Sequence, residues 1–299
     1  MDLTGARILI TGATGQVGGP VATTLAANND VVAIARFGDA KARARLEVAG
    51  VECVTVDFES ADFAALDGTF DVVLHFAVAK TNDFDRDLAA NAEALGFLME
   101  RCADARAFLH CSSTAVYEPE GHHRFVETDP LGDNHRAFGF MPTYSISKIA
   151  AESMARYAAR RFDLPTTIAR LSVPYGDTFG WPLFQLAMLR AGHAIPVHED
   201  APSEYNPIHI DDIIGQIPAL LDAASVPATI VNWAGDDVVS IEAWCTRLAE
   251  RLGLEPQFAP TTKTIASVAC DTTKRRAITG PCTVSWQDGI DRLAAAAAR

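Results

Sequence analysis

Short apolar runs alternate with amphipathic stretches through the first part of the chain. The runs are apolar throughout, which is typical of strands buried on both faces of a parallel sheet. We expect such strands at 8–10, 31–35, 51–56, 71–76, 107–111 and 166–171. The stretches between them repeat apolar residues at helical spacing, and we expect helices that begin near 16 and that cover 85–102 and 143–162. This order predicts an α/β fold with a doubly wound (Rossmann) parallel sheet.

The pattern changes after Pro174, where glycines and prolines break the chain into short pieces. The chain then returns toward the main sheet through 206–233, and helical spacing reappears at 241–252 and 294–298. We therefore expect a second, smaller C-terminal lobe that binds substrate. The expected division is 1–172 with 206–234 for the dinucleotide-binding domain and 173–205 with 235–299 for the substrate lobe.

Aromatic residues are interspersed in the lobe. Two interpretations stay open for them: they line an apolar substrate pocket, or they form the core of the lobe. Under the first interpretation, the candidate substrate contacts in the lobe are Tyr175, Phe179, Trp181 and Tyr205.

A glycine-rich turn joins the first strand to the first helix, with glycines at Gly12, Gly15 and Gly18. In a dinucleotide-binding turn, the first glycine permits a sharp bend, the second a close approach to a pyrophosphate, and the third tight packing of the helix. Free N–H groups at the helix N-terminus suit a phosphate. Since the turn lies between a strand and a helix, we expect a dinucleotide there, also contacted by Thr14, Gln16 and Val17.

The second strand ends at Ala35 and is followed by Arg36. Enzymes of this fold that use NAD usually place an acidic residue here for the ribose 2′-hydroxyl. A carboxylate would repel a 2′-phosphate, whereas a guanidinium can bind one through two hydrogen bonds. We therefore favour NADP as cofactor, with NAD as the alternative; Lys41 and Arg43 lie close by in the sequence.

Ligands of open α/β sheets bind outside the carboxyl ends of the strands. Asp57 is a candidate acceptor for the adenine amino group, and Phe58 is a candidate for stacking on the adenine ring. His75 is expected to be a hydrogen-bonded core residue. Asn91 either organises backbone near the nicotinamide or simply satisfies a buried amide. The remaining candidates near the cofactor are Phe76, Ala77, Val78, Cys111, Leu171 and Val173.

Tyr144 and Lys148 lie at i and i+4, so a helix presents them on one face. A free tyrosine ionises near pH ~10, and a nearby ammonium lowers that value and suits the phenol for acid–base work. Lys148 can also donate to the nicotinamide ribose. Ser113, at a strand end, can orient a substrate oxygen. We expect these three residues to be catalytic, and Tyr144 and Lys148 to contact the cofactor as well.

These motifs together resemble the extended short-chain dehydrogenase/reductase family, also called the NAD-dependent epimerase/dehydratase family. The resemblance covers nearly the whole chain and implies that Ser113, Tyr144 and Lys148 form the catalytic triad. It also implies, by analogy, a homodimer through the helices at 85–102 and 143–162. The matching stretches are 11–18 (TGATGQVG), 71–77 (DVVLHFA), 111–117 (CSSTAVY), 144–148 (YSISK) and 208–212 (IHIDD).

Several positions depart from the family pattern. The Asp–Glu pair of sugar-nucleotide dehydratases is replaced by Thr114 and Ala115, which cannot exchange protons. Val173 stands where epimerases usually have an asparagine, and Tyr205 where they have an arginine for the diphosphate. These departures favour an NAD(P)-dependent oxidoreductase that acts on a carbonyl or secondary alcohol of a small substrate, with Lys80 and Thr114 as further substrate contacts. The alternative is a sugar or nucleotide-sugar epimerase; a non-catalytic NADP sensor is a third possibility, against which the intact triad argues.

Composition and the distribution of apolar residues argue against several classes of protein. The net charge of −13 argues against a nucleic-acid partner. The six cysteines show no metal-ligand spacing, so we expect free thiols and no metal. No apolar run is long enough to cross a bilayer, and no signal peptide precedes the first strand. The expected location is cytoplasmic, with a small molecule as substrate and no membrane partner.

Overall fold

The computed structural model describes residues 1–136 and 139–298. The chain divides into two compact units, each described by itself. Unit 1 comprises Met1–Ser112, Ile146–Ala169 and Gln216–Val231. Unit 2 comprises Ser113–Ser145, Arg170–Gly215 and Asn232–Arg299, of which the last residue is outside the described range. Compared with the expected division, 113–145, 170–172, 206–215 and 232–234 fall in unit 2.

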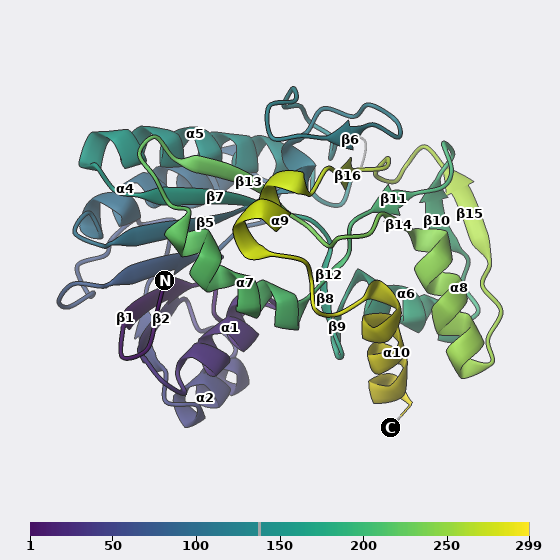
Figure 1. Ribbon diagram of the computed structural model, residues 1–299, viewed down its shortest axis with the longest axis horizontal. Helices are drawn as coiled ribbons and strands as arrows, with labels where there is room; N and C mark the ends of the chain where they lie inside the picture. The colour runs from purple at the N-terminus through teal and green to yellow at the C-terminus, as the bar shows by residue number, and fades with distance from the viewer. Residues whose placement is uncertain (137–138, 299) are drawn as a thin grey trace. The chain divides into compact units, whose positions relative to one another are not determined.

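A seven-stranded sheet organises unit 1 (Figure 1). From one edge to the other its strands are β13 (Thr229–Trp233), β7 (Thr166–Leu171), β5 (Ala107–Ser113), β4 (Val72–His75), β1 (Arg7–Thr11), β2 (Asp30–Ala35) and β3 (Glu52–Thr55). Neighbouring strands from β5 to β3 are parallel. All six expected strands are present, and the doubly wound prediction is confirmed.

The strand order reverses beside β1. The chain proceeds from β1 through β2 to β3 on one side, and then crosses over to place β4 on the other side of β1. In open α/β sheets this reversal opens a crevice at the carboxyl ends of the two strands, where ligands bind. The crevice here is therefore expected between the ends of β1 and β4, at Thr11 and His75.

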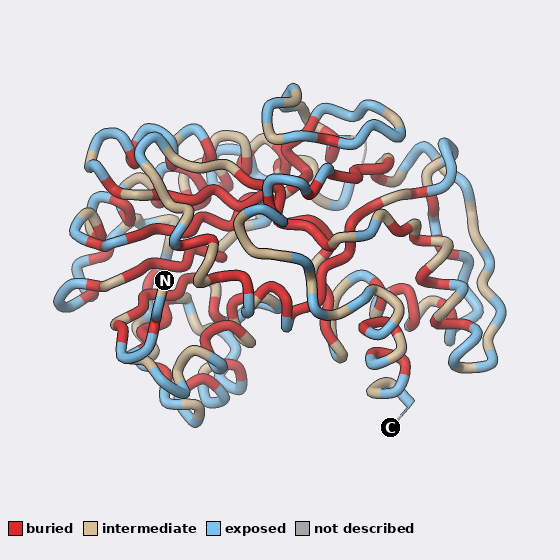
Figure 2. The backbone as a smooth tube through the Cα atoms, viewed as in Figure 1, coloured by how far each residue is buried: buried red, intermediate tan, exposed pale blue. Residues whose placement is uncertain are grey.

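Helices cover the sheet, and their apolar faces explain why the strands are buried (red in Figure 2). Leu9, Val73 and Phe108 share one core cluster with residues of α4 and α5, including Leu95 and Ala155. The helices that lie wholly or mostly in unit 1 are α1 (Gly18–Leu25), α2 (Ala40–Val48), α3 (Phe84–Leu88), α4 (Ala94–Arg101), α5 (Tyr144–Phe162) and α7 (Ile210–Asp222).

Two helices differ from the expectation. The first begins at Gly18 rather than near Gln16. The stretch 85–102, expected to be one helix, consists of three consecutive segments. A π-helical turn, η1 (Ala89–Glu93), lies between the α-helices α3 and α4. Such turns are rare and occur mostly at functional sites.

Unit 2 is built from short elements. Its strands form small sheets, β12–β8–β9, β10–β15, β11–β14 and β16–β6. The stretch 118–142, expected to be a long loop, contributes β6 to them. The strands are β6 (Arg124–Phe125), β8 (Pro174–Gly176), β9 (Phe179–Gly180), β10 (Ile195–His198), β11 (Glu204–Tyr205), β12 (Ile208–His209), β14 (Val239–Ser240), β15 (Phe258–Thr261) and β16 (Ala269–Cys270). The helices are the short η2 (Thr114–Val116), α6 (Trp181–Arg190), α8 (Ile241–Leu252), α9 (Thr273–Thr279) and α10 (Trp286–Ala297).

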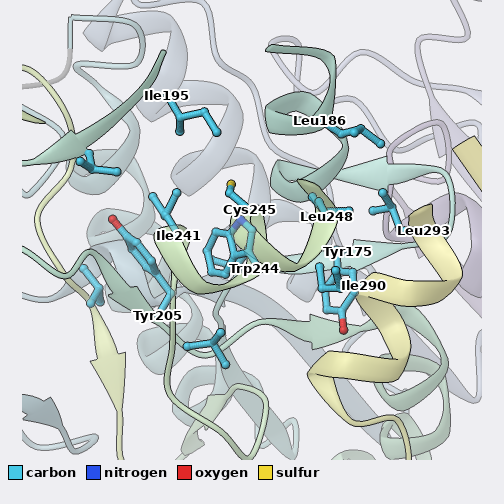
Figure 3. Packing of buried hydrophobic residues seen from close by; sticks show 14 of the residues in the cluster. Tyr175, Leu186, Ile195, Tyr205, Ile241, Trp244, Cys245, Leu248, Ile290 and Leu293 are labelled. Atoms are coloured by element: carbon cyan, nitrogen blue, oxygen red, sulfur yellow. The ribbon is translucent and has the colours of Figure 1, made fainter. Parts of the chain in front are cut away.

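Aromatic side chains form the centre of unit 2. Trp244 is fully buried, and its Nε1 donates to Gln185 Oε1 at 2.5 Å, so the indole leaves no polar atom unmatched. Tyr175 and Tyr205 belong to the same core cluster (Figure 3). For these two tyrosines, the interpretation as core of the lobe describes the structure.

No helix among the described residues has the length and apolar character that a membrane crossing requires.

Candidate active site

The glycine turn lies at the reversal point of the sheet, in close backbone contact with its neighbours. A Cβ on Gly12, which has φ +69°, would lie 2.7 Å from the Ala77 nitrogen. A Cβ on Gly18 would lie 2.4 Å from the Gly12 carbonyl oxygen. Both positions therefore exclude every other residue, as the sequence predicts for this turn.

One buried hydroxyl ties the two strand ends together. The Ala77 N–H donates to Thr11 Oγ1 at 3.0 Å, and Thr11 Oγ1 lies 2.8 Å from His75 Nδ1. The Thr11 hydroxyl thus accepts from Ala77 and also forms a hydrogen bond with the imidazole of His75, so the buried ring has a polar partner on the neighbouring strand. Burial lowers the pKa of His75 to about 3. His75 is thus a hydrogen-bonded core histidine, as expected.

A cavity of about 450 Å³ opens in unit 1 beside this turn. Its walls come from the glycine turn and from the segments that follow β2, β3 and β4, together with η1. Seven expected cofactor contacts are among the lining residues: Gly12, Thr14, Arg36, Asp57, Phe58, Ala77 and Val78. Ala35, Phe37, Gly38, Glu59, Ala79, Ala90 and Asn91 also line it, without having been expected as cofactor contacts.

The cavity fits a dinucleotide in its chemistry. Within the described chain, α1 has no side-chain hydrogen bond at its N-cap, Val17, so its first N–H groups have no capping side chain. The N–H groups of Gly19 and Val21 donate to the carbonyls of Gly15 and Val17, so the groups that could meet a phosphate are the preceding ones, at 16–18. Gly15 lines an adjoining cavity of about 390 Å³ between α1 and α2, and Thr14 lines both.

Two polar residues one helical turn apart hold the loop after β4. Asn91, on η1, accepts from the Ala79 N–H at 2.7 Å and donates to the Ala79 carbonyl at 2.9 Å. Asp87 is fully buried and accepts from the N–H groups of Thr81 and Asn82. The Asn91 amide is therefore satisfied by a backbone segment of the cavity wall, while its expected place near the nicotinamide stays a prediction.

Arg36 is the cation that faces the cavity. It is exposed and forms no ion pair or hydrogen bond with any described residue. Arg43 is differently placed, because its Nε donates to Glu47 at 2.7 Å and its Nη2 to the Cys53 carbonyl at 3.3 Å. Of the two arginines, only Arg36 is therefore positioned to meet a bound phosphate.

The expected catalytic residues lie on β5 and α5. Ser113 ends β5 and is half-buried, and its Oγ accepts from the Ala115 N–H at 3.2 Å. Tyr144 begins α5, and Lys148 follows one turn later on the same helix. The helical spacing that the sequence predicts for Tyr144 and Lys148 is present.

Lys148 is buried, and its Nζ donates to the Cys111 carbonyl at 2.8 Å. Burial lowers the pKa of its ammonium below the usual range, and the carboxylate of Glu152 acts in the opposite direction. Glu152 is itself buried and accepts from Ser112 Oγ at 2.6 Å. Glu152 is not among the residues predicted for the site, although its position one turn after Lys148 on α5 indicates that the two share a helix face.

Other expected contacts lie outside the lining of the cofactor cavity. In unit 1, Gln16 is exposed, Val17 is half-buried, and Phe76 and Cys111 are buried. In unit 2, Leu171 and Val173 are buried, and Val173 belongs to the aromatic core. They remain predictions for which the geometry of each unit gives no separate support.

The expected substrate contacts divide into two groups. Tyr205 is buried, and its hydroxyl donates toward the carbonyls of Ile265 and Ala266 at 3.1 and 3.0 Å. Tyr175 is fully buried. We correct the expectation for these two tyrosines, because they serve the core. Accessible surface remains at Phe179, Trp181 and Lys80, while Thr114 is buried in η2.

Sequence reasoning also missed a histidine beside the expected proton donor. His135 is buried, and the centroid of its ring lies 4.9 Å from that of Tyr144. No local pattern in 118–142 indicates this contact, because it joins a loop to the start of a helix.

The comparisons with known proteins agree with this architecture. The model of the NAD dependent epimerase/dehydratase family matches residues 8–233, and the chain belongs to this family. A comparison with curated protein sequences finds no match.

Several solved structures share the fold over nearly their whole length. One is UDP-glucuronic acid 4-epimerase from Bacillus cereus with UDP-glucuronic acid and NAD (TM-score 0.82, 20% identity, 97% of this chain and 98% of that one). Another is UDP-glucose 4-epimerase from Thermotoga maritima with UDP-glucose (TM-score 0.81, 18% identity, 98% of both chains). A third is UDP-N-acetylglucosamine 4-epimerase from Methanobrevibacter ruminantium with UDP-N-acetylmuramic acid (TM-score 0.82, 14% identity, 99% of both chains). At these identities the likeness establishes the fold.

The buried His75 predicts a loss of stability in acid. Its pKa is about 3 in the folded chain and near ~6.5 when unfolded, so the unfolded state binds more protons between these values. The contribution of the neutral His75 to the free energy of unfolding is fully present above pH ~6.5. Below that pH it falls by about 1.4 kcal/mol per pH unit. From about pH 7 to about pH 5, wild type should lose about 2 kcal/mol more than His75→Gln in urea unfolding.

The exposed His193 supplies the control, since His193→Gln should track wild type at both pH values. Equal acid losses in wild type and His75→Gln would contradict the assignment of His75 as a histidine held neutral by burial.

Proposed function

We propose that the chain is an NAD-dependent epimerase that inverts a secondary alcohol carbon of a nucleotide sugar. The observation that carries the proposal is the arrangement of Ser113 at the end of β5 and of Tyr144 and Lys148 one turn apart on α5. Family membership and the solved epimerases of the same fold support it. This choice departs from the sequence-based preference for net oxidation or reduction.

Each residue has a role that its position supports. Tyr144 takes the proton of the substrate hydroxyl and returns it, and Ser113 donates a hydrogen bond to the same oxygen. Lys148 favours the ionised form of Tyr144 and donates to the cofactor ribose. When bound, the nicotinamide supplies the acceptor and donor of hydride. The cavity beside Gly12 and Arg36 holds the adenosine and phosphate parts.

A second candidate is an NAD(P)-dependent oxidoreductase that releases its reduced cofactor and acts on a substrate without a diphosphate. The burial of Val173 and Tyr205 favours it, because these side chains stand where epimerases place polar groups and offer no charge to a diphosphate. The exposed Arg36 on the cavity wall favours it as well, since a cation there suits the 2′-phosphate of NADP and NADP is suited to net reduction.

Isotope retention separates the two candidates. UDP-glucose and UDP-glucuronic acid deuterated at C4 are incubated with the enzyme and catalytic NAD+. We expect the stereoisomeric product to keep its deuterium with no reduced cofactor free in solution. Stoichiometric release of deuterated reduced cofactor with a ketone product would contradict epimerisation and show net oxidation of the sugar nucleotide. No reaction and no binding of either sugar nucleotide would contradict the proposed substrate class.

Tyr144→Phe tests the proton donor. Removing a general acid–base group should lower kcat about 10²-fold or more while leaving NAD+ affinity nearly unchanged. Tyr157→Phe, an exposed tyrosine on the same helix, is the matched control and should behave as wild type. Turnover of Tyr144→Phe within a few-fold of wild type would remove the assignment.

Arg36 predicts that the cofactor site also accepts NADP. A charge-assisted hydrogen bond to a 2′-phosphate contributes roughly 1.5–3 kcal/mol, or about ten- to hundredfold in affinity. Arg36→Ala should therefore weaken NADP+ binding at least about tenfold and leave NAD+ binding unchanged, measured by calorimetry. The control is Lys41→Ala, a nearby exposed cation outside the cavity lining. If the ratio of NADP+ affinity to NAD+ affinity were the same in Arg36→Ala and in wild type, Arg36 would not contact the 2′-phosphate.

We also propose a homodimer through α4 and α5. Gly96 packs against the side chain of Met154, so the two helices lie together, and each exposes an aromatic residue: Phe97 is 54% exposed and Tyr157 60%. Light scattering should give the mass of a dimer, and Phe97→Glu should convert it to a monomer. Phe184→Glu, on α6, is the control and should stay dimeric. A monomeric wild type would contradict this proposal.

A further inference from the structure

The loop before α5 places a histidine ring against the phenol of Tyr144. The two ring planes meet at 56° with their centroids 4.9 Å apart. His135 is only 4% exposed, so the contact excludes water from that side of the phenol. Both residues belong to unit 2.

Hydrogen bonds fix the imidazole in place. His135 Nδ1 lies 2.6 Å from the amide oxygen of Asn134 and 3.0 Å from Ser145 Oγ. With the amide oxygen of Asn134 as an acceptor, Nδ1 carries its single hydrogen, which is shared between Asn134 Oδ1 and Ser145 Oγ; these two oxygens lie 3.2 Å apart. Ser145 Oγ donates its own hydrogen to the Ala115 carbonyl at 2.7 Å, and so it accepts from His135.

The same chain of hydrogen bonds reaches the serine of the site. Ala115 accepts from Ser145 through its carbonyl and donates through its N–H to Ser113 Oγ at 3.2 Å. The η2 turn that carries Ala115 is buried, so this link is not replaced by water. Ser113 and Tyr144 are therefore joined within unit 2 through Ala115, Ser145 and His135.

We propose that His135 is a positioning residue for Tyr144, and that Ser145 couples this pair to Ser113. The inference rests on the proposed function in one respect: it takes Tyr144 as the proton donor. In this role the imidazole of His135 sets the orientation of the Tyr144 phenol and keeps polar N–H groups beside it. The link through Ser145 and Ala115 then directs both hydroxyls to one substrate oxygen.

If His135 only filled space, its replacement by phenylalanine would not change the ionisation of the Tyr144 phenol. His135→Phe keeps an aromatic ring but removes the donor to Asn134 and Ser145. The surroundings of the phenol become less polar, which disfavours the phenolate. The ionisation of Tyr144 consequently reports on the positioning role, while a purely structural role would leave it unchanged.

The experiment is a pH titration of the enzyme saturated with NAD+ and labelled with ¹³Cζ-tyrosine. The chain has five tyrosines, and Tyr144→Phe assigns the resonance of interest. We expect His135→Phe to raise the measured pKa of Tyr144, lowering its ionisation constant about threefold or more. The neighbouring charged groups, Asp133 with its partner Arg136 and Lys148 further along α5, are present in every variant.

His123→Phe is the matched control. His123 lies in the same stretch of chain, is hydrogen-bonded to Asp129 at 2.8 Å and packs edge-on against Phe125 at 5.1 Å. Its replacement should leave the titration of Tyr144 unchanged. An identical Tyr144 titration in His135→Phe and wild type, with both proteins folded, would overturn the proposal.

Ser145→Ala is the second variant. If His135→Phe does not fold, Ser145→Ala tests whether Ser145 couples His135 and Tyr144 to Ser113. It breaks the link between His135 and Ala115 without touching the phenol. We expect kcat to fall about tenfold, with KM and NAD+ affinity close to wild type. Unchanged kcat would remove the coupling to Ser113. If no sugar nucleotide reacts, the proposed substrate fails, whereas the tyrosine titration still tests the role of His135.

Discussion

The close backbone approach at Gly12 is the constraint on which the site depends. Three segments meet there: the end of β1, the residue after β4 and the start of α1. A Cβ on Gly12 would come within 2.7 Å of Ala77, and one on Gly18 within 2.4 Å of Gly12. Since these distances leave no room for a side chain, the glycine turn brings exposed backbone to the edge of the cavity, where a pyrophosphate needs it.

Buried polar side chains then hold loop and turn backbone of the site through hydrogen bonds. Thr11 fixes Ala77, Asn91 fixes Ala79, and Ser145 fixes Ala115. In each case a side chain satisfies backbone that would otherwise be unpaired, and each unmatched buried group would cost about 1–3 kcal/mol. The wall of the cavity beside Gly12 and the turn beside Ser113, which lie in different units, are therefore both held by hydrogen bonds from side chain to backbone.

The sequence predicts the parts of this structure that have local causes. The apolar strands, the glycine turn and the spacing of Tyr144 and Lys148 follow from short patterns, and the structure contains all of them. The π-helical turn at Asn91 is not predictable in this way, because it accompanies a contact with Ala79 across a loop. Tyr205 was misjudged for a similar reason: its hydroxyl is satisfied by carbonyls some sixty positions later in the chain. The contact between His135 and Tyr144 is likewise not predictable from a local pattern, because it joins a loop to the start of α5.

Hydrogen–deuterium exchange with and without NAD+ tests the central claim, that the cavity at the glycine turn is the cofactor site. If NAD+ binds in this cavity, exchange slows in peptides that cover 11–18 and 76–80, where backbone lines the cavity or borders it. Peptides that cover 282–286, which line a separate cavity of about 370 Å³ in unit 2, should be unchanged. Unaltered exchange at 11–18 in the presence of saturating NAD+ and NADP+ would contradict the account.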